Sequence, residues 1–146
     1  MRLGALCAGE DGLALAVAEH YGASVAWQAE NDRDASAVLA ARFPSVPNLG
    51  DIKVADWATV EPVDVVCAGF PCQGASTAGR RRGMSDERWL WPDVERALGE
   101  LRPRRVVLEN VPGLLTVDGG HAVAGVLHGL ARLVFDAEWG SLPAAS

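Results

Sequence analysis

The sequence predicts an α/β protein with a doubly wound, mostly parallel sheet, and three observations support this fold class. Short apolar runs alternate with segments of helical periodicity along the chain of 146 residues. Val63–Ala68 is apolar except for Asp64, which is typical of a parallel strand buried on both faces. The segment after Pro92 has apolar residues at the spacing of one helix face, namely Val94, Ala97, Leu98 and Leu101. Right-handed crossovers are expected to connect the strands.

The first half of the chain is predicted to contain two strand–helix units. Arg2–Leu6 is expected to form a strand, and a turn rich in glycine and acidic residues leads from it into a helix over Gly12–Tyr21. Ser24–Ala29 is the second predicted strand, and a helix follows over Asp32–Phe43. Residues on one side of this second helix are Ala35, Val38, Leu39 and Arg42, and Pro44 and Pro47 end it.

The second half continues the alternation of strands and helices. A long polar stretch, Gly69–Trp91, separates the strand Val63–Ala68 from the helix that begins at Pro92. Val106–Leu108 is predicted to be another buried strand, Ala122–Val134 an amphipathic helix, and Phe135–Leu142 a last strand. We find no internal repeat and no linker, so residues 1–146 are expected to form one domain.

The composition favours a soluble globular protein, because 49% of the residues are hydrophobic and 22% are charged. No apolar run approaches the roughly 18 residues that a membrane-spanning helix needs. The N-terminus has no signal-peptide pattern, and a cytoplasmic location is therefore expected.

The cysteines and the charge exclude further classes of protein. The three cysteines include no CxxC pair, which argues against a disulfide framework and against a zinc site, and no metal is expected. The net charge is −6, whereas a protein that binds nucleic acid by itself is usually basic. The basic residues are clustered instead, at Arg80-Arg81-Arg82 and at Arg102, Arg104 and Arg105.

Polar and reactive side chains follow the predicted strands at the points where these strands end. Gly9 follows the first strand, Glu30 the second, Cys72 the buried apolar run, and Glu109-Asn110 the strand Val106–Leu108. In a parallel sheet the carboxyl ends of the strands meet at one edge, where ligands bind. These residues are therefore the candidate site.

The acidic residues near the first two strands have two interpretations each. Glu10 and Asp11 in the first turn disfavour a pyrophosphate ligand such as NAD and suit a cationic or zwitterionic cofactor. Glu30 can hold ribose hydroxyls, or it can be a carboxylate at a helix N-terminus, for which Asp32 is an equal candidate. Asp51 and Ile52 can be a cap and a core residue, or they can contact an adenine ring.

Cys72 is the strongest candidate for a nucleophile. Cys67 lies inside a predicted strand and is expected to be a buried small hydrophobe. Cys72 lies beyond that strand, in the turn Gly69-Phe70-Pro71-Cys72-Gln73, ahead of the polar stretch. Its thiolate would be the reactive form, and the arginines at 80–82 would supply positive charge or bind phosphate. Glu109, flanked by apolar residues, can have a raised pKa and donate a proton, or Glu109-Asn110 can simply cap a turn.

Read together, five segments resemble, in order, the N-terminal conserved blocks of DNA cytosine-5 methyltransferases. They are Leu6–Leu13, Glu30-Asn31-Asp32, Gly50-Asp51-Ile52, Gly69-Phe70-Pro71-Cys72-Gln73 and Glu109-Asn110-Val111. The stretch from Cys72 to Arg80 is similar to the mobile catalytic loop of the family. The resemblance covers nearly the whole chain, and it implies the Rossmann-like fold of S-adenosylmethionine-dependent methyltransferases.

The resemblance implies S-adenosylmethionine as cofactor and double-stranded DNA with a flipped cytosine as partner. Glu30 would take the ribose hydroxyls, and Asp51 and Ile52 would contact the adenine. The full set of residues that it assigns to the cofactor is Cys7, Ala8, Gly9, Glu30, Asn31, Asp51, Ile52, Gly69, Pro71 and Leu90.

The resemblance also implies a catalytic group and a set of DNA contacts. Cys72 would add to C6 of the flipped cytosine, Glu109 would protonate or hydrogen-bond N3, and Asn110 would position the catalytic loop. Gln73, Ser76, Arg80, Arg81 and Arg82 would contact the DNA.

The chain departs from the family pattern in three respects. The family normally has phenylalanine where Cys7 stands and glycine where Asp11 stands. The matched blocks end before the family's second arginine block and its target-recognition domain. The resemblance therefore implies that residues 1–146 are a partial catalytic domain, incomplete at the C-terminus, with the edge beside Val106–Leu108 left open.

Three other functions remain possible at this point. The chain can be a half-module that needs a complementing C-terminal chain, or a methyltransferase that acts on cytosine in tRNA. A thiol redox enzyme is disfavoured because no resolving cysteine lies near Cys72.

Overall fold

The computed structural model describes residues 1–71, 84 and 88–143. The chain divides into two compact units. The sheet unit consists of Met1–Pro71 and Leu90–Asn110, and the second unit consists of Cys72–Trp89 and Val111–Ser146. The sequence predicted one domain and no such division.

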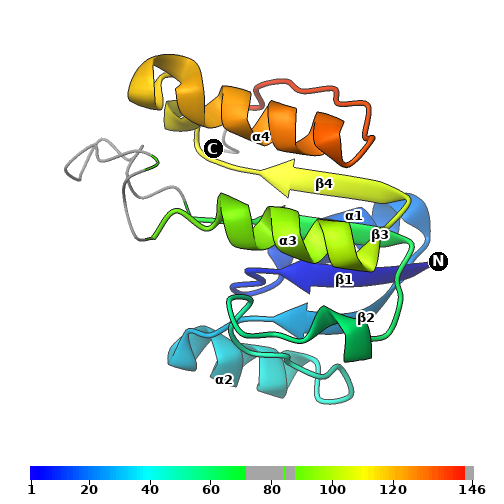
Figure 1. Cartoon of the computed structure of the whole chain (residues 1–146). Helices are drawn as coiled ribbons and strands as arrows, with labels where there is room; N and C mark the ends of the chain where they lie inside the picture. Colours follow the sequence, from blue (N-terminus) through cyan, green and yellow to red (C-terminus); the bar gives the residue numbers. More distant parts are fainter. Residues whose placement is uncertain (72–83, 85–87, 144–146) are drawn as a thin grey trace. The chain divides into compact units, whose positions relative to one another are not determined.

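A sheet of four parallel strands forms the centre of the sheet unit (Figure 1). The strands are β1 (Arg2–Leu6), β2 (Ser24–Ala29), β3 (Val65–Gly69) and β4 (Arg105–Glu109). Their order is β2-β1-β3-β4, so the chain starts at the centre and moves first to one side and then to the other. The predicted parallel sheet is confirmed, and β1 and β2 have the bounds that the sequence predicted.

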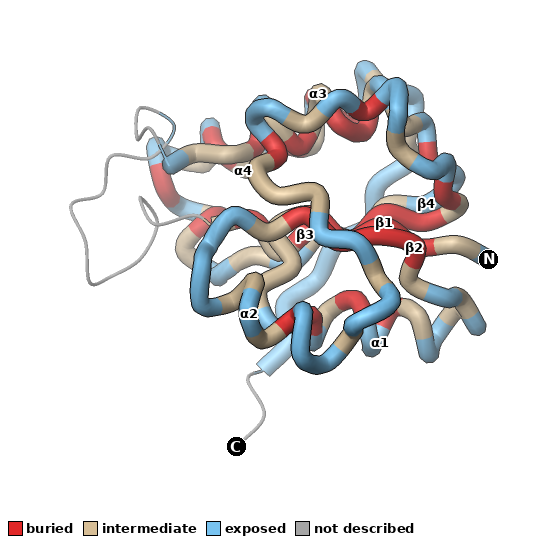
Figure 2. Tube along the Cα trace, turned by 90° about the horizontal axis from the view of Figure 1, so that it is seen from below, coloured by how far each residue is buried: buried red, intermediate tan, exposed pale blue. Residues whose placement is uncertain are grey.

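Helices cover both faces of this sheet. They are α1 (Gly12–Tyr21), α2 (Arg33–Arg42) and α3 (Trp91–Leu101). Figures 1 and 2 show α1 and α3 on opposite faces, as a doubly wound sheet requires. A short 3₁₀ helix, η1 (Trp57–Thr59), precedes β3.

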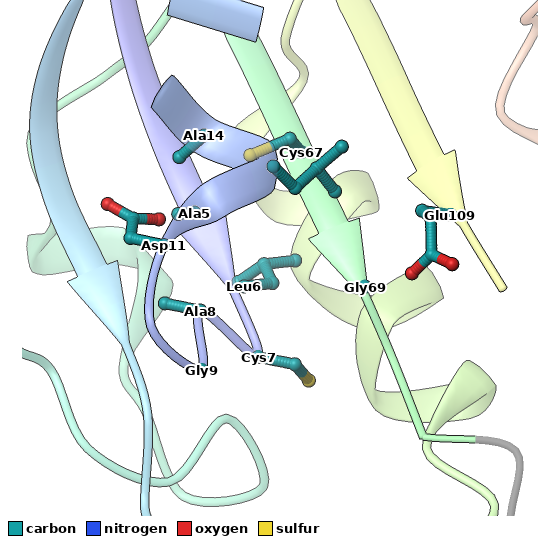
Figure 3. Close-up of a pocket in the computed structure, with 11 residues that line it drawn as sticks. Ala5, Leu6, Cys7, Ala8, Gly9, Asp11, Ala14, Cys67, Gly69 and Glu109 are labelled. Atoms are coloured by element: carbon teal, nitrogen blue, oxygen red, sulfur yellow. The ribbon is translucent and has the colours of Figure 1, made fainter. Parts of the chain in front are cut away.

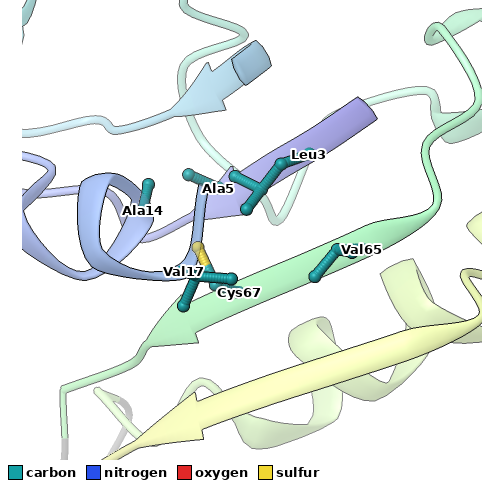
Figure 4. Close-up of a cluster of buried hydrophobic side chains, with 6 residues drawn as sticks. All are labelled: Leu3, Ala5, Ala14, Val17, Val65 and Cys67. Carbon is teal, nitrogen blue, oxygen red and sulfur yellow. The ribbon is translucent and has the colours of Figure 1, made fainter. Parts of the chain in front are cut away.

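The core between α1 and the sheet is built from alternate residues of β1 and β3 (Figure 4). Leu3 and Ala5 of β1 and Val65 and Cys67 of β3 point to the same face, where Ala14 and Val17 of α1 pack against them. All six residues are buried. Within the predicted strand, Val63 and the residues 65–68 are buried, as predicted, whereas Asp64 is half-buried.

The indole of Trp27 fills the space beside Gly4, where any other residue would have its side chain. A Cβ atom on Gly4 would lie 2.1 Å from Cζ2 of Trp27, so only glycine fits there. The indole of Trp27 packs against that of Trp57 at 5.7 Å between ring centroids, and its Nε1 donates to the Glu61 carbonyl at 3.0 Å. This packing anchors η1 against β2.

The described part of the second unit contains short 3₁₀ helices followed by an α-helix. These are η4 (Pro112–Leu115), η5 (Val117–Gly120) and α4 (His121–Arg132). Leu114, Val117 and Ala122 form a small core with Trp89 and Val123. Among the residues that the structure describes, in either unit, no helix has the length and apolar character needed to cross a membrane.

Two expectations about the C-terminal half are wrong. Phe135–Leu142 forms no strand, although these residues are described. Trp139 is 66% exposed and Leu142 92% exposed, so the alternating apolar residues find no surface to cover. β4 is not fully buried either, since its central residues are only half-buried and its ends are exposed. Within the described residues β4 pairs with β3 alone, which leaves it at the edge of the sheet.

Candidate functional site

A cavity of about 210 Å³ lies at the carboxyl ends of β1 and β3. Figure 3 shows its lining residues, which come from the turn after β1, the start of α1, and the ends of β3 and β4. Five of the predicted site residues line it: Cys7, Ala8, Gly9, Gly69 and Glu109. The strand ends thus bring these residues together, as the parallel topology requires.

The turn after β1 is tight because three of its residues have left-handed backbone conformations. The φ angles are 51° at Cys7, 55° at Gly9 and 66° at Asp11. The Asp11 N–H donates to the Ala8 carbonyl at 2.7 Å and closes the turn. Glycine and aspartate are among the residues that tolerate such angles at low cost, which is the physical reason for this composition.

Asp11 is a buried residue and not an exposed charge in front of a ligand. It is 1% exposed, and its Oδ2 accepts a hydrogen bond from Nε2 of Gln28, which is fully buried on β2. Burial raises the pKa of Asp11, while the bond from Gln28 and the nearby Arg42 oppose this shift. Asp11 Oδ1 and Gln28 Oε1 have no hydrogen-bond partner among the described residues.

Glu30 joins the ends of the first two strands. Its Oε2 accepts from the Gly9 N–H at 2.7 Å, and its Oε1 accepts from the Asp32 N–H at 2.8 Å. Asp32 is the residue that caps α2, with its Oδ1 accepting from the N–H groups of Asp34 and Ala35. Asp32 therefore caps α2, while the Glu30 carboxylate lies between the glycine turn and the N-terminal end of α2.

Asp51 and Ile52 lie in the turn that follows Gly50. Asp51 Oδ1 accepts from the Lys53 N–H at 2.9 Å, which is a cap within the turn, and Ile52 is 4% exposed. The guanidinium of Arg96 on α3 donates to the Ile52 carbonyl at 2.7 Å and holds the turn from the other side. The turn is thus fixed at defined backbone groups.

Two cysteines in the sheet unit have strongly raised pKa values. Burial raises the pKa of Cys7 to about 12, with further contributions from the carboxylates of Glu30, Asp51 and Asp93. Burial also raises the pKa of Cys67 to about 12, and Asp11 adds to the effect. Both thiols remain protonated at neutral pH, so neither is a ready nucleophile. Cys67 is the core residue that the sequence predicted.

Three carboxylates contribute to the raised pKa of Cys7, so the turn after β1 lies in a negatively charged environment. Glu30 and Asp51 were predicted site residues, whereas Asp93 was missed. Its only sequence signal is its position as an acidic residue in the first turn of α3, which has an ordinary structural explanation in the helix dipole. A cationic ligand is favoured in such a surrounding.

Glu109 and Asn110 end β4 beside the end of β3. Gly69 pairs in register with Glu109, and a Cβ on Gly69 would lie 3.3 Å from Glu109 Oε2, so the glycine leaves room for the carboxylate. Asn110 Nδ2 donates to the Phe70 carbonyl at 2.9 Å. Glu109 is exposed, at the end of a strand that lies at the edge of the sheet within the described residues.

The structure describes some of the other predicted residues and not the rest. Asn31 is exposed, Pro71 is half-buried, and Leu90 is the half-buried residue before α3. Cys72, Gln73, Ser76, Arg80, Arg81 and Arg82 lie outside the described residues. The predicted roles of these six residues therefore stay predictions.

One residue that sequence reasoning missed is Asn48. Its side chain contacts Glu30, Ser36 and Gly50 through hydrogen bonds of 3.0–3.1 Å. An asparagine two residues before a glycine is typical of a turn, and this signal gives no indication of a site.

Comparison with known proteins gives a family. The family model described as C-5 cytosine-specific DNA methylase matches residues 1–146. Type II methyltransferase M.HhaI of Haemophilus parahaemolyticus is 35% identical over 129 residues, which are 88% of this chain and 39% of that protein. Type II methyltransferase M.DsaV of Dactylococcopsis salina is 34% identical over 122 residues, covering 83% of this chain and 34% of that protein. A DNA N-6-adenine-methyltransferase of Escherichia phage P1 is 38% identical over 142 residues, covering 88% of this chain and 19% of that protein.

Solved structures agree on the fold. A DNA modification methyltransferase encoded within an E. coli prophage has a TM-score of 0.72 and 26% identity, over 90% of this chain and 38% of that chain. S. pombe Dnmt2 methyltransferase has a TM-score of 0.62 at 15% identity, over 88% of this chain and 41% of that chain, and shows the fold alone. The chain spans 34% and 39% of the lengths of M.DsaV and M.HhaI. Since the family model matches every residue, the chain belongs to the C-5 cytosine-specific DNA methylase family.

Proposed function

We propose that this protein transfers a methyl group from S-adenosylmethionine to C5 of cytosine in double-stranded DNA, through a covalent bond between Cys72 and C6 of the base. The observation that carries the proposal is the match of the family model over residues 1–146, which include Pro71-Cys72-Gln73 and Glu109-Asn110. In sequence, these two segments follow β3 and β4, which are adjacent parallel strands.

The residues at the ends of β1 and β2 fit S-adenosylmethionine. The cavity is lined by Cys7, Ala8 and Gly9, and the carboxylates that act on Cys7 give it a negatively charged environment. Such an environment suits a cofactor that carries a sulfonium and an amino group. The Glu30 carboxylate accepts one backbone N–H on each oxygen and retains lone pairs for ribose hydroxyls. When bound, the cofactor supplies an electrophilic methyl group.

Further residues complete the proposed cofactor site. Asp51 and Ile52 contact the adenine from the turn after Gly50, and Asn31 flanks the ring. Gly69, Pro71 and Leu90 close the site beside β3 and α3. NAD is disfavoured as a ligand, because its pyrophosphate would be repelled by the carboxylates of Glu30, Asp51 and Asp93.

The proposed chemistry is carried by Cys72, Glu109 and Asn110. The Cys72 thiolate adds to C6 of a flipped cytosine, and the displaced ring electrons are neutralised at N3, where Glu109 donates a proton or a hydrogen bond. C5 becomes nucleophilic and would take the methyl group, with the S–CH3 bond broken and S-adenosylhomocysteine left as the second product. Loss of the C5 proton and cleavage of the C6–S bond then return the thiolate and release 5-methylcytosine. The exposure of Glu109 supports this role, since a base entering from solvent can reach its carboxyl group.

Asn110 and the residues from Gln73 to Arg82 have supporting roles in the proposed reaction. Asn110 holds the Phe70 carbonyl, two residues before Cys72, and thereby fixes the backbone where the catalytic stretch starts. Gln73, Ser76 and the arginines at 80–82 contact the DNA, with the arginines binding phosphates.

The product of methyl transfer tests this proposal. The protein is incubated with methyl-labelled S-adenosylmethionine and with double-stranded DNA or tRNA, and the nucleosides are separated after digestion. Label in 5-methylcytosine from DNA is the expected result. Label in tRNA alone, or in N6-methyladenine from DNA, would contradict the proposed substrate. The adenine control is motivated by the activity for which the phage P1 relative is named.

A further inference from the structure

The side-chain amide of Asn48 connects two parts of the proposed cofactor site, Glu30 and the turn at Gly50. Its Oδ1 accepts from the Glu30 N–H at 3.0 Å and from the Gly50 N–H at 3.0 Å. Its Nδ2 donates to the Glu30 carbonyl at 3.1 Å and to Ser36 Oγ at 3.1 Å. Both lone pairs and both protons of the amide are therefore used.

The backbone on either side brings Asn48 to this place. The Gln28 N–H donates to the Pro47 carbonyl at 2.9 Å, and the Leu49 N–H donates to the Gln28 carbonyl at 2.7 Å. This short parallel bridge aligns Asn48 with the last part of β2, just before Glu30. Gly50 then has a φ of 76°, which turns the chain toward Asp51.

The network converges on Glu30 from three directions. Ser36 Oγ on α2 donates to the Glu30 carbonyl at 3.1 Å, the same oxygen that Asn48 Nδ2 contacts. Both backbone polar groups of Glu30 are thus held by side chains, while its carboxylate is held by the N–H groups of Gly9 and Asp32. A residue fixed at all of these atoms can present its carboxylate in one orientation.

We propose that Asn48 is a positioning residue that couples Glu30 to the Asp51 turn and thereby sets the affinity for the adenosine part of the cofactor. The inference rests on the proposed function, in which Glu30 takes the ribose and Asp51 the adenine. Asn48 acts through these two residues and does not itself contact the cofactor.

The exposure of Asn48 separates this role from a purely structural one. Asn48 is exposed, so water can replace its hydrogen bonds at little cost to folding. Water does not hold the Glu30 backbone and the Gly50 turn at a fixed separation. Loss of Asn48 should therefore lower cofactor affinity more than it lowers stability.

The test measures the dissociation constant of S-adenosylmethionine by calorimetry and the urea midpoint of each variant. Asn48→Ala should weaken binding by about 3- to 10-fold, the range expected for the net value of one hydrogen bond. Ser36→Ala removes only one arm of the network and should give a smaller loss. Asp56→Ala is the matched control, since Asp56 is also exposed and caps a backbone N–H, that of Ala58, which does not belong to the Asn48 network.

A double-mutant cycle with Glu30→Ala distinguishes positioning from independent effects. If Asn48 acts through Glu30, Asn48→Ala should cost clearly less affinity in the Glu30→Ala background than in the wild type. Equal losses in both backgrounds, an unchanged dissociation constant, or the same loss in Asp56→Ala would overturn the role of Asn48. If the wild type binds no S-adenosylmethionine, the proposed cofactor falls first and the role of Asn48 with it.

Discussion

Asp11 stands where the family pattern has glycine, and the structure gives the physical reason that both residues can occupy the position. The backbone at Asp11 has a φ of 66°, an angle that glycine adopts freely and that aspartate and asparagine tolerate. The aspartate side chain is then buried against Gln28, where it meets one hydrogen-bond donor and no second partner among the described residues. The departure from the pattern thus leaves the turn intact and places a titratable group in the core.

This buried carboxyl should make the stability of the protein depend on pH. Burial raises the pKa of Asp11 in the folded state above its unfolded value of about 4. The folded state therefore keeps the proton in a pH window where the unfolded chain has released it. Stability from this group is present below the unfolded pKa and is lost as the pH rises through the folded pKa.

Asp11→Asn should remove this loss, because an amide does not titrate and tolerates the same backbone angle. The free energy of unfolding, measured in urea at a series of pH values from about 4 to 8, should fall less with pH in the variant than in the wild type. At neutral pH the variant should be more stable by about 1 kcal/mol, the order of the cost of an unsatisfied buried group. Parallel pH curves for the two proteins would show that Asp11 is ionised in the folded state at no cost.

At the scale of elements, β1 and β2 can pack as they do because Gly4 of β1 has no side chain. The indole of Trp27 fills the space beside Gly4, and it lies too close for any Cβ atom. Gly4→Ala should therefore lower the free energy of unfolding by about 1–3 kcal/mol or more, because the indole and η1 behind it must move. Urea unfolding followed by tryptophan fluorescence measures both the stability and the environment of Trp27.

Gly12→Ala is the matched control for this change. Gly12 is the first residue of α1, and a Cβ atom there would meet nothing within 4 Å. This variant should be as stable as the wild type or more stable by up to about 1 kcal/mol, since alanine favours the helix. If both glycine variants lose the same stability, steric contact with Trp27 is not the cause.

Most elements were predictable because their hydrophobic pattern matches their burial. β1, β2 and α1 have the predicted bounds, and the buried face of α3 consists of Val94, Ala97 and Leu98 from the pattern, with Trp91 added and Leu101 only half-buried. Phe135–Leu142 also alternates apolar and polar residues, yet it forms no strand. A strand needs a partner as well as a pattern, and the pattern of one segment does not encode which edge is within reach.

At the scale of the whole molecule, the site is assembled from turns that are far apart in the sequence. The parallel topology alone predicts that the residues after β1, β2, β3 and β4 lie at one edge, and Gly9, Glu30, Gly69 and Glu109 do so. The apolar pattern of β4 alone did not predict the exposure of Glu109, whereas the open edge beside this strand was implied by the family resemblance. Asn48 was missed because its partners, Glu30, Ser36 and Gly50, are recognisable only once α2 and the Gly50 turn have folded against β2.

The electrostatics of the sheet unit disfavour two of the three cysteines as nucleophiles. Cys7 is half-buried and Cys67 is buried, and both have pKa values raised to about 12, so they should not react readily at neutral pH. Cys72 lies outside the described residues, and its assignment as nucleophile is the central claim of the proposed function. That claim can be tested without knowledge of the DNA recognition sequence.

The most direct measurement is the capture of the protein on duplex DNA in which every cytosine is replaced by 5-fluorocytosine, in the presence of S-adenosylmethionine. The fluorine at C5 cannot leave as a proton does, so a thiol that has added to C6 should stay bonded to the DNA. We predict a complex that survives denaturation in the wild type and in Cys67→Ala, that is absent in Cys72→Ser, and that maps to the peptide containing Cys72. A complex that persists in Cys72→Ser, or that maps to Cys67 or Cys7, would contradict the account.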